Sequence, residues 1–148
     1  MALISKPMYT LTNLRRGMGS FWDNVSAEEI DALYNLCSPN ADRVLASLTL
    51  PEDNPTEALL SRWLVRFINS SSQKLVRRFV QFATGCSCLV PGKTIRVEIV
   101  DGFEAVPRPT ASTCFSIFRL PRQYRSFAHL SENLEFYLTN TQFWDLSG

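Results

Sequence analysis

The sequence predicts an α+β fold, with a helical N-terminal half followed by a small mixed β-sheet packed with helices. Three patterns support this prediction. Apolar residues recur at helical spacing up to Ala83, apolar and polar residues alternate from Thr94, and a last helical pattern begins near Ser126. The chain has 148 residues and is 45% hydrophobic, so it can build the core of one ordinary domain without disulfide staples.

The clearest start signal for a helix is a capping box formed by Ser26 and Glu29. The serine hydroxyl of such a box accepts a hydrogen bond from the backbone three residues on, and the glutamate side chain reaches back to the serine N–H. Apolar residues follow at helical spacing from Ile30. These signals predict a helix over about Ala27–Cys37.

Two proline signals divide the chain further. Pro39 suits the first turn of a second, short helix that carries Val44 and Leu48. The stretch Pro51-Glu52-Asp53-Asn54-Pro55 is typical of a turn or linker. We therefore predict a helical segment over residues 1–50 and a second domain over residues 51–148.

Two helices are expected at the start of the second domain. Thr56 is the candidate cap of the first, whose apolar face runs to Phe67, and Asn69–Ser72 interrupts the helical pattern. The second helix follows this interruption and ends at Gly85, where a left-handed C-cap is favoured.

Two β-rich runs follow these helices. The alternation over Ile95–Ile99 predicts a half-buried strand, and Asp101-Gly102 is a turn signal after which the chain could return over Phe103–Val106. Prolines 107 and 109 disfavour regular structure as far as Ala111. A second β-rich run covers Phe115–Leu120 and stops at Pro121.

The last predicted helix starts near Ser126. It is expected to bury a set of apolar residues at helical spacing: Phe127, Leu130, Leu134, Tyr137 and Leu138.

Composition excludes several classes of function. The net charge is +1 and only 20% of residues are charged, so no basic field indicates nucleic acid. No run approaches the roughly 18 apolar residues of a membrane span, and no secretory signal is evident. We therefore expect neither a nucleic-acid nor a membrane partner, and a cytoplasmic or nuclear location in which the four cysteines are reduced.

A metal site is not expected either. Cys86-Ser87-Cys88 has one intervening residue, whereas zinc pairs are usually separated by two to four. The other candidate soft ligands are Cys37, Cys114 and His129, which are far apart in the sequence. The sequence thus predicts no metal and no cofactor.

Two separated blocks resemble the C-terminal lobe of HECT-type ubiquitin ligases. Gln81-Phe82-Ala83-Thr84-Gly85 is similar to a family helix that ends in Gln-Phe-x-Thr-Gly. Thr113-Cys114-Phe115, with Leu120-Pro121 downstream, is similar to the family's Thr-Cys-Phe-Asn segment and its Leu-Pro pair. Phe143 resembles the aromatic residue that the family keeps a few positions from its C-terminus. Weaker resemblance to the end of the larger N-lobe extends over residues 13–54.

The resemblance implies a HECT-type ubiquitin transferase, with residues 51–148 as the C-lobe. Cys114 would accept ubiquitin from a conjugating enzyme as a thioester and pass it to substrate lysines. Ser112, Thr113 and Phe115 would form the supporting catalytic loop, and Phe143 would help to present ubiquitin to the acceptor. Most of the lobe that docks the conjugating enzyme would be missing, so the chain is expected to be a fragment or a truncated relative.

The chain also departs from the family pattern. Ser112 stands where the family often has His, Ser116 replaces the usual Asn, and Tyr124 falls one residue later than the family's tyrosine. A degenerate lobe that binds ubiquitin or a protein partner without forming a thioester is therefore the alternative.

Glu104 and Asp145 are candidate proton acceptors for the transfer to lysine, but no spacing favours either. His129 is a candidate base for Cys114, although a surface or helix-start role is the more common one for such a residue. A cysteine hydrolase is disfavoured because His129 is the only histidine.

Overall fold

The computed structural model describes residue 19 and residues 24–102 and 105–141. Within this part of the chain there are five α-helices, a four-stranded sheet and one 3₁₀ turn. The chain divides into two compact units, Met1–Leu36 and Cys37–Gly148, and each is considered by itself. The predicted α+β class, with a small mixed sheet packed by helices, is confirmed.

Helix α3 covers Ala27–Cys37, as the sequence predicts. Its capping box is present: Glu29 N–H donates to Ser26 Oγ at 3.1 Å, and Ser26 N–H donates to the Glu29 carboxylate at 2.8 Å. None of the residues in α3 is buried. Local capping, rather than packing into a core, therefore defines this helix in the described structure.

The second compact unit starts with a short helix, α4 (Ala41–Ser47), and a two-residue strand, β1 (Leu48–Thr49). Asn40 caps the helix, which begins at Ala41: the Asn40 side chain accepts a hydrogen bond from Arg43 N–H at 2.9 Å. The expectation that Pro39 occupies the first turn is therefore wrong by two positions. This unit includes residues that precede the expected linker at Pro51–Pro55.

Helix α5 covers Pro55–Ser70 and is capped by Asn54, whose side chain accepts from Glu57 N–H at 3.0 Å. Thr56, the predicted cap, is instead the second residue of the helix. Proline is well suited to the first helical position, where its missing N–H has no helical partner to lose. The pair Asn54-Pro55 thus supplies both the cap and a favourable first residue of the helix, a signal that the sequence prediction did not use.

Helix α6 (Gln73–Thr84) begins after Ser72, which caps it, and ends at Gly85. Gly85 adopts the predicted left-handed conformation with φ 75°, and its N–H donates to Gln81 O at 2.8 Å. One face of α6 is almost completely buried. The interruption predicted over Asn69–Ser72 is confirmed only for Ser71 and Ser72, because α5 continues through Ser70 and α6 starts at Gln73.

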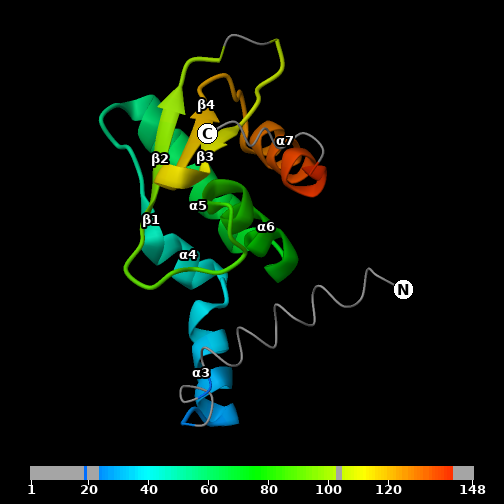
Figure 1. Cartoon of the computed structure of the whole chain (residues 1–148). Helices are drawn as coiled ribbons and strands as arrows, with labels where there is room; N and C mark the ends of the chain where they lie inside the picture. The colour runs from blue at the N-terminus through cyan, green and yellow to red at the C-terminus, as the bar shows by residue number, and fades with distance from the viewer. Residues whose placement is uncertain (1–18, 20–23, 103–104, 142–148) are drawn as a thin grey trace, which may run out of the picture. The chain divides into compact units, whose positions relative to one another are not determined.

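The sheet has the order β1-β2-β4-β3 and is mixed. Strand β2 (Ile95–Val100) pairs in parallel with β1 and with β4 (Ile117–Pro121), and β3 (Thr110–Ser112) pairs antiparallel with β4. Figure 1 shows β2 and β4 side by side. The predicted β2 strand is confirmed.

The second β-rich run and its surroundings differ from the prediction in three ways. Both sheet partners of β2 are parallel, so the expected return strand is absent from the described residues, which leave out 103 and 104. The second run starts as a strand only at Ile117, because Thr113–Phe115 form the 3₁₀ turn η1. Strand β3 begins at Thr110, directly after Pro109, so Thr110 and Ala111 form regular structure where the prolines were expected to prevent it.

Helix α7 (Phe127–Thr139) is capped by Ser126, whose Oγ accepts from His129 N–H at 3.2 Å. Leucines 130, 134 and 138 are each completely buried, as expected for one face of a helix. Arg78 of α6 donates to the backbone oxygens of Leu138 and Thr139 at 3.2 and 2.7 Å. A cation is favourable at a helix C-terminus, so Arg78 fastens the end of α7 to α6.

The core lies between the inner face of the sheet and helices α5, α6 and α7. Phe118 of β4 is at its centre, with no exposed surface and with edge-on contacts to Phe79 and Phe82 of α6 at 5.0 and 6.0 Å between ring centroids.

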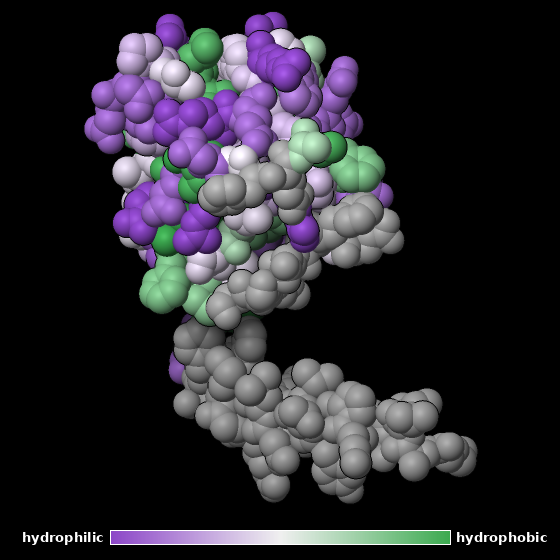
Figure 2. Space-filling view, turned by 90° about the horizontal axis from the view of Figure 1, so that it is seen from above, coloured by the Kyte–Doolittle hydropathy of each residue, from purple (hydrophilic) through white to green (hydrophobic). Residues whose placement is uncertain are grey.

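On the molecular face drawn in Figure 2, hydrophilic side chains predominate and apolar ones occur in small separate groups. The structure thus buries its aromatic residues mainly where α6 meets β4.

Phe118→Ala should lower the free energy of unfolding by about 3–5 kcal/mol, because it removes a fully buried ring and leaves a cavity. Urea denaturation of the full chain measures this loss. Phe136→Ala is the matched control: Phe136 is 50% exposed, so its truncation should cost less than about 1 kcal/mol. Equal losses in the two variants would contradict the position assigned to Phe118.

Candidate functional site

The cysteine of the second motif block lies in the 3₁₀ turn η1, between β3 and β4. Ser116 ends this turn in a left-handed conformation with φ 52° and ψ 47°. Its N–H donates to Thr113 O at 3.3 Å, and its carbonyl oxygen accepts from Arg96 N–H of β2 at 2.9 Å. The turn is therefore closed on itself and also attached to the neighbouring strand.

The two motif blocks, almost 30 positions apart in sequence, meet at one point. A Cβ placed on Gly85 would lie 3.3 Å from Thr113 Cβ, which is tighter than an ordinary van der Waals contact. Gly85 thus combines two requirements for glycine: a left-handed φ and close approach of another residue. The C-terminus of α6 supports the turn that carries the cysteine.

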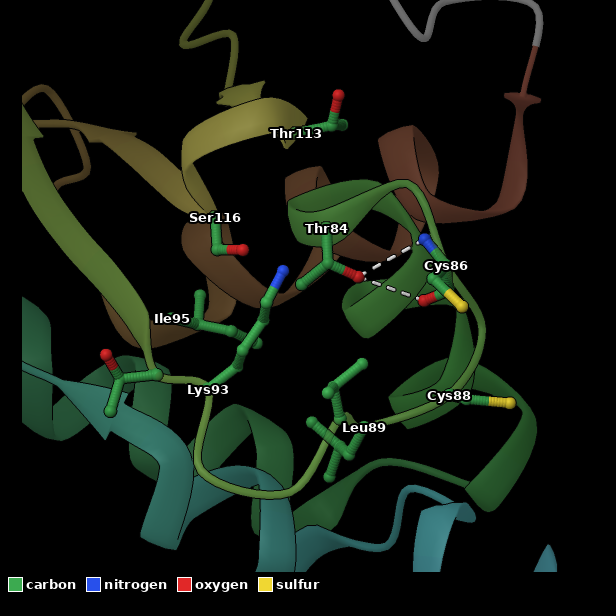
Figure 3. Close-up of a pocket in the computed structure, with 10 residues that line it drawn as sticks. Thr84, Cys86, Cys88, Leu89, Lys93, Ile95, Thr113 and Ser116 are labelled. Carbon is green, nitrogen blue, oxygen red and sulfur yellow. Dashed lines mark hydrogen bonds between the residues drawn. The ribbon is translucent and has the colours of Figure 1, made fainter.

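A pocket of about 90 Å³ lies beside η1 (Figure 3). Leu89 and Ile95 are among its apolar lining residues. Its polar lining combines residues from the end of α6, from the following loop and from η1. These polar residues are Thr84, Cys86, Cys88, Lys93, Thr94, Thr113 and Ser116.

Thr84 organises the loop on one side of this pocket. Its hydroxyl donates to Val80 O at 2.7 Å and is 3.0 Å from Cys86 O, and Cys86 N–H donates to the same hydroxyl at 3.2 Å. The dashed lines in Figure 3 mark the two contacts with Cys86. The threonine of the first motif block therefore sets the path of the chain as it leaves α6.

The loop on the other side contains a tight turn over residues 90–93. Lys93 N–H donates to Val90 O at 3.1 Å, and Gly92 has φ 79°. Proline followed by a glycine with positive φ is typical of a type II turn. Figure 3 shows the Lys93 side chain extending into the pocket, with its amine between Ser116 and Thr84.

The residues predicted for the catalytic loop occupy one short segment. Cys114 is exposed, and Phe115 is 76% exposed, unusual for a large apolar side chain. Ser112 ends β3 and makes no side-chain capping bond to η1. Thr113 lies between the pocket and Gly85. The exposed pair Cys114 and Phe115 is held between the partly buried Thr113 and Ser116.

Phe143, predicted to help present ubiquitin, lies outside the described residues. The candidate bases Glu104 and Asp145 lie outside them as well. The third, His129, is on α7, where its ring packs edge-on against Tyr124 at 5.4 Å between centroids. His129 lines a different hollow, together with Ala105 and Arg125, and not the pocket beside η1.

Tyr124 has a structural environment. Its hydroxyl donates to Asn133 Oδ1 at 2.6 Å, and burial, with a smaller contribution from Tyr137, raises its pKa above the usual range. A hydroxyl held in this way is a poor proton donor or acceptor for a reaction. The tyrosine therefore connects the end of β4 to α7.

Ser116 and Lys93 were not identified as site residues from the sequence. A signal for Ser116 was available, since the family usually has Asn at this position and Asn tolerates a left-handed backbone better than Ser does. The turn signal Pro91-Gly92 could have located Lys93, but only the fold brings that turn beside η1.

Among the described residues, no group of three or more His, Cys, Asp and Glu side chains is arranged to hold a metal ion. In the same part of the chain, no helix has the length and apolar character needed to cross a membrane.

Comparison with known proteins identifies the family. No individual curated protein sequence matches the chain. The family model described as HECT-domain (ubiquitin-transferase) matches residues 28–147, which include both motif blocks and most of the chain. The two motif blocks are in contact through Gly85 and Thr113, and both lie within the matched residues. The chain therefore belongs to the HECT-domain family of ubiquitin transferases.

Proposed function

We propose that the chain is the acyl-transfer part of a HECT-type ubiquitin ligase, and that Cys114 is its nucleophile. The observation that carries the proposal is the exposure of Cys114 on a turn whose two ends are fixed, by Thr113 against Gly85 and by Ser116 against β2. A thiol that exchanges with another protein must be accessible and held in a defined position.

In the proposed first step, the Cys114 thiolate attacks the carbonyl carbon of the thioester between ubiquitin and a conjugating enzyme. A new C–S bond forms, the old C–S bond breaks, and the thiolate of the conjugating enzyme leaves. Because one thioester replaces another, the step needs little driving force, and thiolates are strong nucleophiles without an adjacent base. The separation of His129 from this pocket is compatible with that chemistry.

The loop residues have proposed roles in this step. Ser112 and Thr113 carry hydroxyl groups on either side of the entry to η1, where they could donate to the developing oxyanion. Phe115 offers an exposed apolar surface for an incoming protein. In the second step, a substrate lysine displaces Cys114, and we assign Phe143 to the presentation of ubiquitin on the basis of family resemblance.

In this proposal, the N-terminal segment, residues 1–50, would be the end of the N-lobe, and residues 51–148 would be the C-lobe. The partners would be ubiquitin, a conjugating enzyme docked mainly through the larger lobe, and protein substrates, in the cytoplasm or nucleus. The alternative, a lobe that binds ubiquitin without forming a thioester, is a possible outcome of the first experiment below.

A ubiquitin probe with an electrophilic C-terminus should label Cys114 selectively, because this thiol is both exposed and fixed. Peptide mass spectrometry locates the adduct, and Cys114→Ala should abolish it. Cys86→Ala is the matched control, since Cys86 is also exposed but lies outside η1, and it should retain labelling. Labelling spread over all four cysteines would contradict selective transfer; ubiquitin binding without any adduct would support the non-catalytic alternative.

Gly85→Ala should slow the acylation of Cys114 by roughly three- to ten-fold, because the added methyl group pushes Thr113 and misplaces the turn. Gly92→Ala is a strict control: Gly92 has nearly the same φ, but a Cβ there meets nothing within 4 Å. Both variants should lose about 1–2 kcal/mol of stability through left-handed strain, and only Gly85→Ala should react slowly. Labelling rates of Cys114 are measured on folded protein from reactions quenched at successive times. Equal rates for Gly85→Ala and Gly92→Ala would refute the supporting role of Gly85.

A further inference from the structure

We propose that the pocket beside η1 is a carboxylate-binding site, in which Lys93 binds an aspartate or glutamate side chain of a protein substrate. Only the identity of the partner as a substrate rests on the proposed function. The inference goes further by naming the chemical class that the pocket selects: protein segments in which an acidic residue lies near the acceptor lysine.

The pocket carries a positive charge that no carboxylate in its own lining balances. Among the described residues that line it, only Lys93 is charged, and Figure 3 shows the Lys93 side chain extending into the pocket. None of the four ion pairs that link described side chains uses Lys93. An amine without an anionic neighbour in its pocket favours an anion from another molecule.

Two donors are placed to hold a carboxylate. In Figure 3 the Lys93 amine ends beside the Ser116 hydroxyl. Ser116 uses its backbone N–H and carbonyl group for Thr113 and Arg96, and its hydroxyl has no hydrogen bond to a described residue. A carboxylate has two acceptor oxygens, one for the ammonium group and one for the hydroxyl. A single lysine balances one negative charge, so the pocket suits a carboxylate better than a phosphate, which carries almost two.

The size of the pocket fits one side-chain group. Its volume of about 90 Å³ equals the share of about three water molecules in liquid water. Sites for whole small molecules usually have about 300–1,000 Å³. Ile95, which lines the pocket, is 2% exposed, and apolar surroundings strengthen the attraction between a lysine and a carboxylate. The pocket can therefore anchor one acidic side chain of a larger molecule.

The surface around the pocket suits a protein partner. Val90 lines the pocket and is 49% exposed, and Phe115, directly before Ser116, is 76% exposed. Exposed apolar side chains beside a polar site are typical of surfaces that bind proteins. A segment anchored in the pocket would be held at η1, the turn that carries Cys114.

A binding test uses the full chain and two synthetic peptides, each with one lysine among glycine, alanine and serine residues. One peptide has glutamate two positions before and after the lysine, and the other has glutamine at both places. We expect the glutamate peptide to bind about two- to five-fold more tightly, because only it can pair with Lys93. NMR titration measures both affinities and should shift the amide signals of Lys93 and Ser116. Higher ionic strength should reduce the preference.

Substitution of Lys93 tests whether its charge causes the preference. Lys93→Gln should abolish the preference for glutamate. Lys93→Glu should reverse it towards a third peptide with arginine at the same two positions, a result that a merely structural role would not produce. An unchanged preference in Lys93→Gln, or equal binding of the glutamate and glutamine peptides to the unaltered chain, overturns the carboxylate site.

The chain offers a matched control lysine. Lys74 is exposed in the first turn of α6, and Gly85, which contacts η1, follows the last turn of the same helix. At 1.5 Å per residue, Lys74 is roughly 16 Å from Gly85 along the helix axis. Lys74→Gln removes the same charge as Lys93→Gln and should leave the preference intact. Equal loss in both variants would show a general effect of net charge and overturn the site.

A transfer test separates this inference from the proposed function. Ubiquitin with a small-molecule thioester at its C-terminus loads Cys114, the peptides are added, and isopeptide products are measured after dithiothreitol has removed thioesters. Transfer to the glutamate peptide should be about two- to five-fold faster, and Lys93→Gln should remove this difference. Equal transfer rates overturn the selection of substrates. Failure to load Cys114 overturns the proposed function, while the binding test, which involves no thioester, still decides the carboxylate site.

Discussion

The close contact between Gly85 and Thr113 is the constraint on which the site depends. Gly85 ends α6 in a conformation that other residues rarely adopt, and the absence of its side chain leaves room for Thr113 at 3.3 Å from the missing Cβ position. α6 itself is anchored by Phe79 and Phe82 against Phe118 of β4. The aromatic core therefore fixes both the helix and the strand between which the cysteine turn is held.

Much of the fold follows from signals that act over a few residues. The capping box at Ser26, the glycine C-cap at Gly85 and the alternation in β2 all identify their elements correctly, because the stabilising bonds lie within four residues or along one strand. Errors arise where neighbouring signals compete, as when Asn54 rather than Thr56 caps α5. The pairing of β2 with β4 was also missed, since parallel partners are joined by a long connection that leaves no turn signature.

The sequence predicts the position of the candidate cysteine but not the pocket beside it. The motif around Cys114 locates a candidate nucleophile, and its exposure in η1 agrees with what such a role requires. Sequence spacing could not reveal that Thr84, Lys93 and Ser116 share a pocket, because three separate elements bring them together. Ser116 illustrates the remaining difficulty: its left-handed backbone is set by bonds to Thr113 and Arg96 that form only in the folded state.

The strand order has a consequence for association with other chains. The two longest strands, β2 and β4, are internal, and the sheet edges are β1 with two residues and β3 with three. Exposed strand edges recruit other chains into continuous sheets, and short edges limit this hazard. Within the described sheet, few backbone groups at an edge are therefore open to edge-to-edge pairing. The sheet that flanks the exposed Cys114 in η1 therefore offers no long template for edge-to-edge aggregation.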